Sequence, residues 1–306
     1  MQIVKFGQKI KGNIIMTLGY MDCVHIGHRK LLDAAKRAAE FLEDFDGEKV
    51  MTAAFTFSNN PFTTLKKDIL PIYDLDTRLR RLGTDYAVTA EFDEEFAALS
   101  ADNFLDIIVE TANIKGIVTG YDYRFSANAE KGVDYLKEYL LKRGISLITV
   151  ETAFYGGEKV SSSEIRRLIK DGKIKEANAL LGSSYMVSGT AVHGTHTGAT
   201  LGFPTVNILP KDGIVRLKEG VYVTKTQVDG KVFGSLTNAG GRPTFDGNGE
   251  YIFETYINGI NRDLYGKYIE IEFLERIRDI VKFNDRESLI RQLEKDKERI
   301  IYFRNF

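Results

Sequence analysis

Residues 19–28 read Gly-Tyr-Met-Asp-Cys-Val-His-Ile-Gly-His, and this stretch indicates how the first half of the chain is built. It follows an apolar run, Ile14–Leu18, that is typical of a buried parallel strand. It precedes residues 29–42, where apolar side chains recur at helical spacing. His25 and His28 therefore stand at a helix N-terminus, where free N–H groups and the helix dipole attract phosphate. Imidazoles there can donate hydrogen bonds to charge that grows on a triphosphate. The stretch predicts nucleotide chemistry.

The composition is that of an ordinary soluble globular protein. The chain has 306 residues, of which 43% are hydrophobic and 28% charged, with a formal net charge of −1. This length exceeds that of most proteins with a single hydrophobic core, so we expect two domains. The near-zero charge gives no general attraction to nucleic acid. A single cysteine excludes an intrachain disulfide framework. The chain also has no signal-peptide layout and no membrane-length apolar run. We expect a cytoplasmic protein without nucleic-acid or membrane partners, and the sequence leaves its oligomeric state open.

Up to about residue 182, short apolar strands alternate with helical segments. This alternation predicts a doubly wound parallel sheet, a Rossmann-like α/β domain. The expected strands are Ile14–Leu18, Val50–Phe57, Tyr86–Thr89, Ile114–Thr119 and Ile145–Val150. The expected helices cover residues 29–43, 93–111 and 131–143, followed by two short helices within 163–181.

From Tyr185 onward, period-two strands are separated by Gly, Asn and Asp turns. The clearest hairpin has Asp229-Gly230 at its turn, because this pair supplies the positive φ angles of a type I′ turn. An amphipathic helix, with Asn284 expected as its N-cap, closes the chain. These signals predict a small antiparallel barrel with a C-terminal helix. We therefore divide the chain into domains 1–184 and 185–306.

Three motifs of the first domain occur in an order that is typical of one family. They are the opening stretch, Gly120–Phe125 (Gly-Tyr-Asp-Tyr-Arg-Phe) and Val160–Arg166 (Val-Ser-Ser-Ser-Glu-Ile-Arg). They resemble the HIGH-motif nucleotidyltransferases, and specifically the prokaryotic bifunctional riboflavin kinase/FMN adenylyltransferase family. The first motif of that family reads Gly-Asn-Phe-Asp-Gly-Val-His-Leu-Gly-His. Its matches here are Gly19, Asp22, Val24, His25, Gly27 and His28.

The resemblance implies that the FMN phosphate attacks the α-phosphorus of ATP, giving FAD and pyrophosphate. His25 and His28 would stabilise the transition state, Arg166 would neutralise the leaving pyrophosphate, and Mg²⁺ would bridge phosphates. The nucleotide-binding residues that it implies are Gly19, Asp22, Gly27, Asp122, Arg124, Ser162 and Ser163. Without the resemblance, Ser161 and Glu164 are a capping box and Arg166 is a solvated helix residue.

The second domain carries its own motifs. Residues 193–198 read His-Gly-Thr-His-Thr-Gly, residues 201–207 read Leu-Gly-Phe-Pro-Thr-Val-Asn, and 238–245 read Asn-Ala-Gly-Gly-Arg-Pro-Thr-Phe. They resemble the riboflavin kinase signature of the same family. The residues implied to bind nucleotide are Gly194, Gly198, Pro204 and Asn238. Thr205 and Asn207 would hold Mg²⁺, which prefers hard oxygen ligands.

Glu254 is the implied general base toward the 5′-hydroxyl of riboflavin. Strand alternation puts Ile252, Glu254 and Tyr256 on one face, and we expect that face to point inward. On the residues alone, an isolated strand glutamate is more often exposed to solvent.

The positions that depart from the family pattern include Tyr20, Met21, Cys23, Asn60, Ala199 and Ile280. They keep two alternatives open. One is a paralogue with a single activity, in which case the kinase is the one expected to survive, and the other is a flavin- or nucleotide-binding protein without activity. A zinc site shared by the pairs His25/His28 and His193/His196 is a further alternative. An aminoacyl-tRNA synthetase fragment is disfavoured, because the Lys-Met-Ser-Lys-Ser motif is absent from the sequence.

Overall fold

The computed structural model describes residues 1–192, 203–211, 213–241, 251–260 and 262–301. The chain forms two compact units, Met1–Ser162 and Ser163–Phe306. The helices between 163 and 181 group with the second unit, whereas the sequence placed them in the first domain. The domain boundary at 184 remains a prediction.

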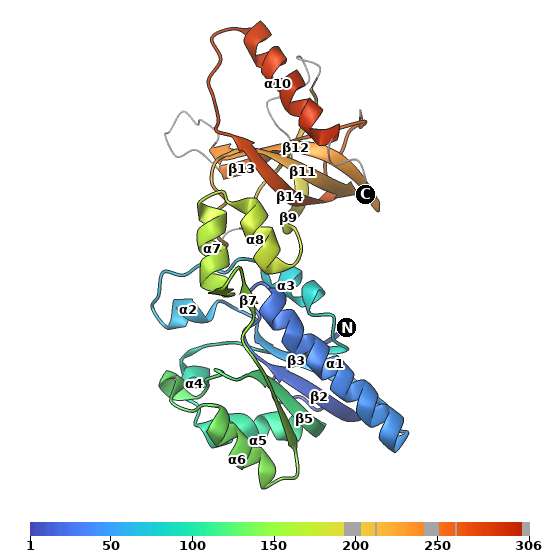
Figure 1. Cartoon of the computed structure of the whole chain (residues 1–306), viewed down its shortest axis with the longest axis vertical. Coiled ribbons are helices and arrows are strands. Elements are labelled where there is room, and N and C mark those ends of the chain that lie inside the picture. The colour runs from blue at the N-terminus through green and yellow to red at the C-terminus, as the bar shows by residue number, and fades with distance from the viewer. Residues whose placement is uncertain (193–202, 212, 242–250, 261, 302–306) are drawn as a thin grey trace. The chain divides into compact units, whose positions relative to one another are not determined.

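The first unit is built on a six-stranded sheet in the order β1-β4-β3-β2-β5-β6 (Figure 1). Every neighbouring pair of strands is parallel. The doubly wound parallel sheet predicted from the sequence is therefore confirmed. The strands are β1 Gln2–Lys5, β2 Asn13–Leu18, β3 Val50–Phe57, β4 Tyr86–Ala90, β5 Asn113–Gly120 and β6 Ser146–Val150.

Helices cover both faces of this sheet. They are α1 Ile26–Asp46, α2 Pro61–Thr64, α3 Leu75–Leu82, α4 Glu94–Ala97, α5 Ala101–Thr111 and α6 Val133–Leu141. A 3₁₀ turn, Ala127–Ala129, and a small hairpin of β7 Phe154–Tyr155 and β8 Glu158–Lys159 complete the unit. The single helix expected over 93–111 is wrong. Two helices occur there because the Ser100 hydroxyl accepts the N–H of Asn103 and starts α5.

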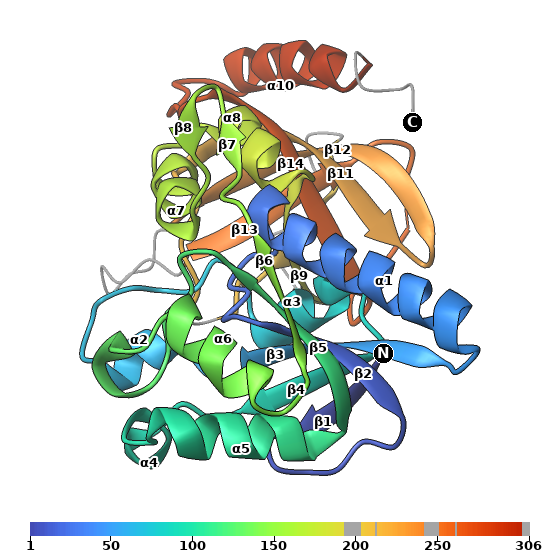
Figure 2. The same ribbon diagram turned by 60° about the horizontal axis from the view of Figure 1, so that its bottom comes forward.

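Alternating side chains of the central strand β2 point into two separate cores. Ile15 packs with α1 and α3, on residues such as Leu32 and Leu79. Met16 packs on the opposite face with α5 and α6, among them Phe104 and Leu136. Figure 2 shows α1 on one side of the sheet and α5 and α6 on the other. Such two-sided burial explains why the strands of this unit read as continuous apolar runs.

The strand order fixes where a ligand can bind. From β2 the chain proceeds to β3 and β4 on one side, and then crosses to β5 and β6 on the other. In open parallel sheets, ligands occupy the crevice at the carboxyl ends of the strands where the order reverses. That point lies between the ends of β2 and β5, so the loops after Leu18 and Gly120 define it.

The second unit contains a closed antiparallel barrel in the order β10-β13-β12-β11-β14-β9 (Figure 1). This confirms the predicted barrel with its C-terminal helix. The elements are α7 Ser162–Lys170, α8 Ile174–Leu181, β9 Tyr185–Val192, β10 Thr205–Ile208, β11 Gly220–Val228, β12 Lys231–Gly241, β13 Tyr251–Ile257, β14 Tyr268–Arg278 and α10 Arg286–Ile301.

Of two local predictions for this unit, the turn is confirmed and the helix N-cap is wrong. Asp229 and Gly230 have φ angles of 48° and 75°, as the type I′ turn requires. The predicted N-cap Asn284 is wrong by one residue. Asp285 accepts the backbone N–H of Ser288 at 2.7 Å, so the helix begins one position later. Both residues are good cap formers, and the sequence alone does not separate them.

The interior of the barrel holds a ladder of buried hydroxyl groups. Thr226, Ser235, Thr224, Thr237 and Thr255 are linked in that order by hydrogen bonds of 2.7–3.0 Å between their hydroxyl oxygens. All five side chains are buried. The opposite surface of the same strands packs against α10, through Ile300 on Val223 and Leu236. The ladder therefore identifies which strand faces point inward.

Candidate active sites

The loop between β2 and α1 is conformationally strained. Met21 and Val24 have positive φ angles of 52° and 49°. A β-branched residue such as valine rarely adopts this conformation. Strain of this kind is kept where the surrounding structure requires it, and it concentrates at functional sites. The loop thus has the features of a binding loop before its side chains are considered.

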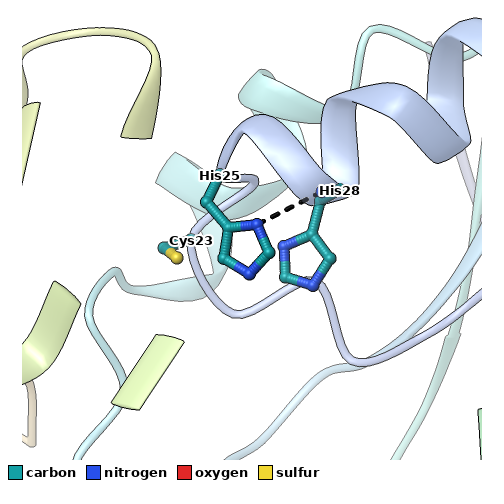
Figure 3. A group of neighbouring side chains, drawn as sticks. All are labelled: Cys23, His25 and His28. Atoms are coloured by element: carbon teal, nitrogen blue, oxygen red, sulfur yellow. Dashed lines mark hydrogen bonds between the residues drawn. The ribbon is translucent and has the colours of Figure 1, made fainter. Parts of the chain in front are cut away.

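His25 is the N-cap of α1. Its Nδ1 accepts the backbone N–H of His28 at 3.2 Å (Figure 3). The two imidazole rings stack with their centroids 3.8 Å apart and their planes 9° from parallel. Gly27 favours this packing, because a Cβ there would make a tight contact of 3.0 Å with Cε1 of His25.

The cap determines which nitrogen of His25 carries the ring proton. Nδ1 accepts a hydrogen bond from an N–H group, so the proton of the neutral ring sits on Nε2. Burial lowers the pKa of His25 to about 4, and a hydrogen bond from the ring to the backbone of His25 itself offsets only part of that effect. Burial also lowers the pKa of His28, and the proximity of His25 lowers it further. Both rings are therefore neutral near pH 7, and His25 can donate from Nε2.

These histidines lie in a cleft of about 430 Å³ at the carboxyl ends of β2 and β5. The cleft brings together most residues that the sequence assigned to nucleotide. The predicted residues that line it are Gly19, His25, Gly27, His28, Asp122, Arg124 and Ser162. Tyr20, Met21, Lys159 and Ser161 line it as well.

Asp22 and Cys23 are buried beneath the loop and are not among the residues that line the cleft. The Asp22 carboxylate accepts the N–H of Ile72 at 3.1 Å and so braces the loop from below. The Cys23 sulfur lies 3.6 Å from the hydroxyl oxygen of Ser162. The thiol thus occupies space under the loop, and it does not crowd the cleft as a Cβ beside the phosphates would.

Two charged residues follow β5 on the other side of the cleft. Asp122 forms an ion pair with Lys159 at 2.5 Å. Arg124 donates from Nε to the carbonyl of Ala129 at 2.8 Å and from Nη2 to that of Glu130 at 3.2 Å. Arg124 therefore holds its own loop in place while it lines the cleft.

The remaining predicted residues of this motif set lie on α7. Ser163 is exposed, and Arg166 is buried. Glu164 is paired with Arg167 at 2.6 Å. The prediction that Arg166 is a solvated helix residue, made without the resemblance, is wrong.

A second cavity, of about 620 Å³, adjoins the first and is largely aromatic. It shares Gly19, Tyr20, Tyr123 and Arg124 with the cleft that His25 and His28 line, which we call the histidine cleft. Its aromatic lining consists of Tyr20, Phe55, Phe57, Phe62, Phe92, Phe96, Phe104, Tyr123 and Phe125. Sequence reasoning missed this cavity. The one local signal was the pair Phe55 and Phe57, which lie two apart on β3 and therefore on one face.

Asn60, where the family pattern has a histidine, is a structural residue. Its side chain caps α2 by accepting the N–H of Phe62 at 3.2 Å, and it donates to the carbonyl of Ile69 at 2.9 Å. It therefore shapes the segment that carries Phe62 to the aromatic cavity.

The barrel presents an oxygen-rich site on neighbouring strands. The Thr205 hydroxyl donates to Oε1 of Glu254 at 2.8 Å. Asn207 on β10 and Asn238 on β12 are the register partners of Glu254 on its two sides. The side-chain oxygens of both asparagines are buried and have no hydrogen-bond partner among the described residues. Such buried oxygens beside a carboxylate form a donor set that suits Mg²⁺.

The expectation that Glu254 points into the barrel is wrong. Thr255 belongs to the interior hydroxyl ladder, so Glu254 and Tyr256 lie on the outer face and are half-buried. The sequence misled because Ile252 and Tyr256, which share the face of Glu254, are apolar too. A ring contact between Phe203 and Tyr256, at 5.4 Å, partly covers this face.

A cleft of about 340 Å³ opens beside Thr205. Pro204, Arg262, Asp263 and Tyr265 also line it. Ile280, where the family pattern has glutamate, lies on the backbone of Gly240. Gly194, Gly198 and Ala199 lie outside the described residues, as do His193 and His196 of the alternative zinc site.

Cys23, His25 and His28 place their potential metal-binding atoms within 4.8 Å of one another (Figure 3). Two features oppose a shared ion. Nδ1 of His25 already uses its lone pair to accept a hydrogen bond, and Nε2 carries the ring proton, so neither nitrogen has a free lone pair for a metal. A metal on Nε2 would move the proton to Nδ1, because a histidine ligand normally donates from the nitrogen that is not bound to the metal, and Nδ1 could then no longer accept the N–H of His28. The stacked rings also direct their in-plane lone pairs alongside each other and not at a common point.

The fold and these two sites define a nucleotidyltransferase joined to a small-molecule kinase. The family models that match the chain are FAD synthetase, over residues 7–164, and riboflavin kinase, over residues 181–303. The bifunctional riboflavin kinase/FMN adenylyltransferase of Listeria monocytogenes is 34% identical over 294 residues, which cover 94% of this chain and 91% of the relative. The enzyme of the same name from Bacillus subtilis is 34% identical, over 95% of this chain and 93% of its own. The chain belongs to the bifunctional riboflavin kinase/FMN adenylyltransferase family.

Among solved structures, a protein from Streptococcus pneumoniae resembles the whole chain. It is named as a macrolide-efflux protein, is 30% identical with a TM-score of 0.87, and the match covers 100% of both chains. Among the described residues of this chain, none of the helices has the length and apolar character needed to cross a membrane.

Proposed function

We propose that this chain makes FAD from riboflavin in two ATP-dependent steps, with phosphorylation in the barrel and adenylylation in the first unit. One observation carries the assignment of the second step. The histidine cleft and the aromatic cavity share Gly19, Tyr20, Tyr123 and Arg124, so one ligand can occupy both. FMN has the matching form, with a flat aromatic ring system at one end and a phosphate at the other.

In adenylylation, the isoalloxazine ring lies in the aromatic cavity and the phosphate reaches the cleft. A phosphate oxygen of FMN attacks the α-phosphorus of ATP, a new P–O bond forms, and the bond to the β-phosphate breaks to release pyrophosphate. His25 donates its Nε2 proton to the oxygens on which charge accumulates, because its tautomer is fixed by the cap. A neutral imidazole is well suited here, since it donates a hydrogen bond without transferring the proton. The role of Arg166 toward pyrophosphate remains a prediction from the motif.

In phosphorylation, Glu254 accepts the proton of the riboflavin 5′-hydroxyl. The hydroxyl oxygen then attacks the γ-phosphorus of ATP, and ADP leaves. Thr205 donates to Glu254 and holds the carboxylate in one orientation. Thr205, Asn207 and Asn238 offer the oxygens that would hold Mg²⁺, which neutralises phosphate charge when bound.

The cytoplasmic location remains a prediction.

Incubation of the protein with riboflavin, ATP and Mg²⁺, followed by separation of the products, tests both steps. FAD formation supports the full proposal. FMN without FAD would indicate the alternative paralogue that keeps only the kinase. If neither FMN nor FAD is formed, the alternative that remains is a flavin- or nucleotide-binding protein without activity. A second reaction started from FMN separates the adenylylation from any failure of the kinase.

A further inference from the structure

A buried arginine lies behind the shared wall of the two cavities in the first unit. Arg78 of α3 is only 3% exposed. Its Nη1 donates to the carbonyl oxygen of Tyr20 at 3.2 Å, and its Nη2 donates to that of Phe57 at 2.8 Å. Burying a guanidinium costs free energy, and here hydrogen bonds from its N–H groups to two backbone segments offset part of that cost. The segments are the loop after β2 and the end of β3.

A threonine completes this clamp. The Thr56 hydroxyl accepts from Nη1 of Arg78 at 3.1 Å and donates to the Tyr20 carbonyl at 2.5 Å. Three hydrogen bonds therefore connect Tyr20, Thr56 and Arg78 in a closed triangle. The guanidinium also lies against the Tyr20 ring, with Cζ 4.8 Å from the ring centroid. Arg78 thus contacts both the backbone and the side chain of Tyr20.

Tyr20 stands where the two cavities meet. It lines the histidine cleft and the aromatic cavity. Its ring is nearly perpendicular to Phe62, at 85° and 6.0 Å between centroids, and lies 6.2 Å from Phe57. The family pattern has asparagine at this position, so an aromatic ring here is a property of this chain.

From these contacts we infer that Tyr20 is a specificity-determining residue that contacts the ribityl-phosphate arm of FMN, and that Arg78 is its positioning residue. The inference rests on the proposed placement of FMN across both cavities. The arm must pass from the aromatic cavity to the histidines, and Tyr20 is one of the four residues at that passage. Arg78 acts through Tyr20, because its donors go to the loop and the strand end and not into the cleft.

The test uses the full chain and steady-state FAD formation, with FMN and ATP varied separately. Tyr20→Asn, which introduces the family residue, is expected to raise the KM for FMN about 10-fold and to leave the KM for ATP unchanged. Tyr20→Phe retains the ring and should lie between the wild type and Tyr20→Asn. Arg78→Lys retains the charge but loses the forked donors of the guanidinium, so it should also raise the KM for FMN. Tyr155→Asn and Arg37→Lys, at exposed positions, are matched controls.

Riboflavin kinase activity of each variant is the internal control, since the barrel is a separate unit. If Arg78→Lys fails to fold, the Tyr20 variants still decide. Equal increases in the KM for FMN and ATP, or no change in either, would overturn the inference. If the wild type forms no FAD, the proposed function fails, and titration with FMN then tests the inference by itself. Weaker FMN binding by Tyr20→Asn supports it, and unchanged binding refutes it.

Discussion

The imidazole rings of His25 and His28 stack 3.8 Å apart, and Nδ1 of the first ring accepts the backbone N–H of the second residue. One side chain thus caps a helix and presents an oriented donor to the cleft. The two roles are compatible because the cap uses Nδ1 and leaves Nε2 free to donate. A serine or aspartate cap would satisfy the same helix end without a ring N–H to donate into the cleft.

Replacement of His25 by asparagine should separate these roles. Asparagine is a good N-cap, so the helix start is kept, but it does not reproduce the Nε2 donor. We expect FAD formation from FMN to fall at least about 100-fold, the usual cost of losing one donor to developing charge. Product analysis with supplied FMN measures the loss, and the kinase reaction in the same sample should be unchanged. Retained FAD formation would show that the donor lies elsewhere.

The lowered pKa of His25 predicts acid sensitivity of the first unit. Its pKa falls from 6.5 to about 4 on folding, because burial disfavours the charged ring. Between these values the unfolded chain binds more protons, so stability decreases as pH falls from 6.5 toward 4 and is unaffected above that window. The loss attributable to this residue approaches about 3 kcal/mol at the lower end. Urea unfolding across the window should show a weaker pH dependence for His25→Asn, whose side chain does not titrate. An identical dependence would contradict the assignment.

The sequence was informative where a local segment determines its own structure. The apolar run before Gly19, the helical spacing after His28 and the Asp229-Gly230 turn each carry their signal within a few residues. The fold class and the histidine loop followed from them. The family motifs then identified the chemistry, because their order along the chain is as specific as their residues.

The sequence was not informative where the structure assembles distant residues. The aromatic cavity draws Phe55, Phe92, Phe104 and Phe125 from separate elements, and none of these residues marks a site by itself. Arg78 reads as an ordinary helix residue, and only packing shows that it is buried. The face of Glu254 was misassigned for a related reason. Both faces of β13 are rich in apolar residues, so alternation does not reveal which one the barrel encloses.

Cys23→Gly tests whether the departure from the family pattern impairs the first site. The side chain is buried under the loop and does not line the cleft, so restoring glycine should not accelerate FAD formation. We expect a loss of stability of about 1–2 kcal/mol, from added loop entropy and a small void. Thermal unfolding and FAD formation are measured together, with Cys23→Ala as the control that keeps Cβ. A faster reaction for Cys23→Gly alone would show that Cβ hinders the phosphates.

The barrel site predicts different effects for variants of Glu254 and of Asn207. Glu254→Gln should reduce FMN formation by about 10²–10⁴-fold, the range for loss of a general base. Asn207→Ala removes an unpartnered oxygen and should raise the Mg²⁺ concentration needed for half-maximal rate, whereas Asn207→Asp keeps an oxygen ligand and should not. Titration of Mg²⁺ at saturating riboflavin measures both. FAD formation from supplied FMN should persist in Glu254→Gln. An unchanged Mg²⁺ requirement in Asn207→Ala would place the metal elsewhere.

The hydroxyl ladder inside the barrel should contribute to stability through its connections. The Thr237 hydroxyl is bonded to Thr224 at 2.9 Å and to Thr255 at 3.0 Å, and all three side chains are buried. Thr237→Val keeps the shape but leaves two buried hydroxyls short of a partner, which costs about 1–3 kcal/mol. Thr190→Val makes the same change at an exposed position of β9 and should cost much less. Chemical denaturation of the two variants gives the comparison. Equal losses would mean that the ladder is no more than a polar filling of the barrel.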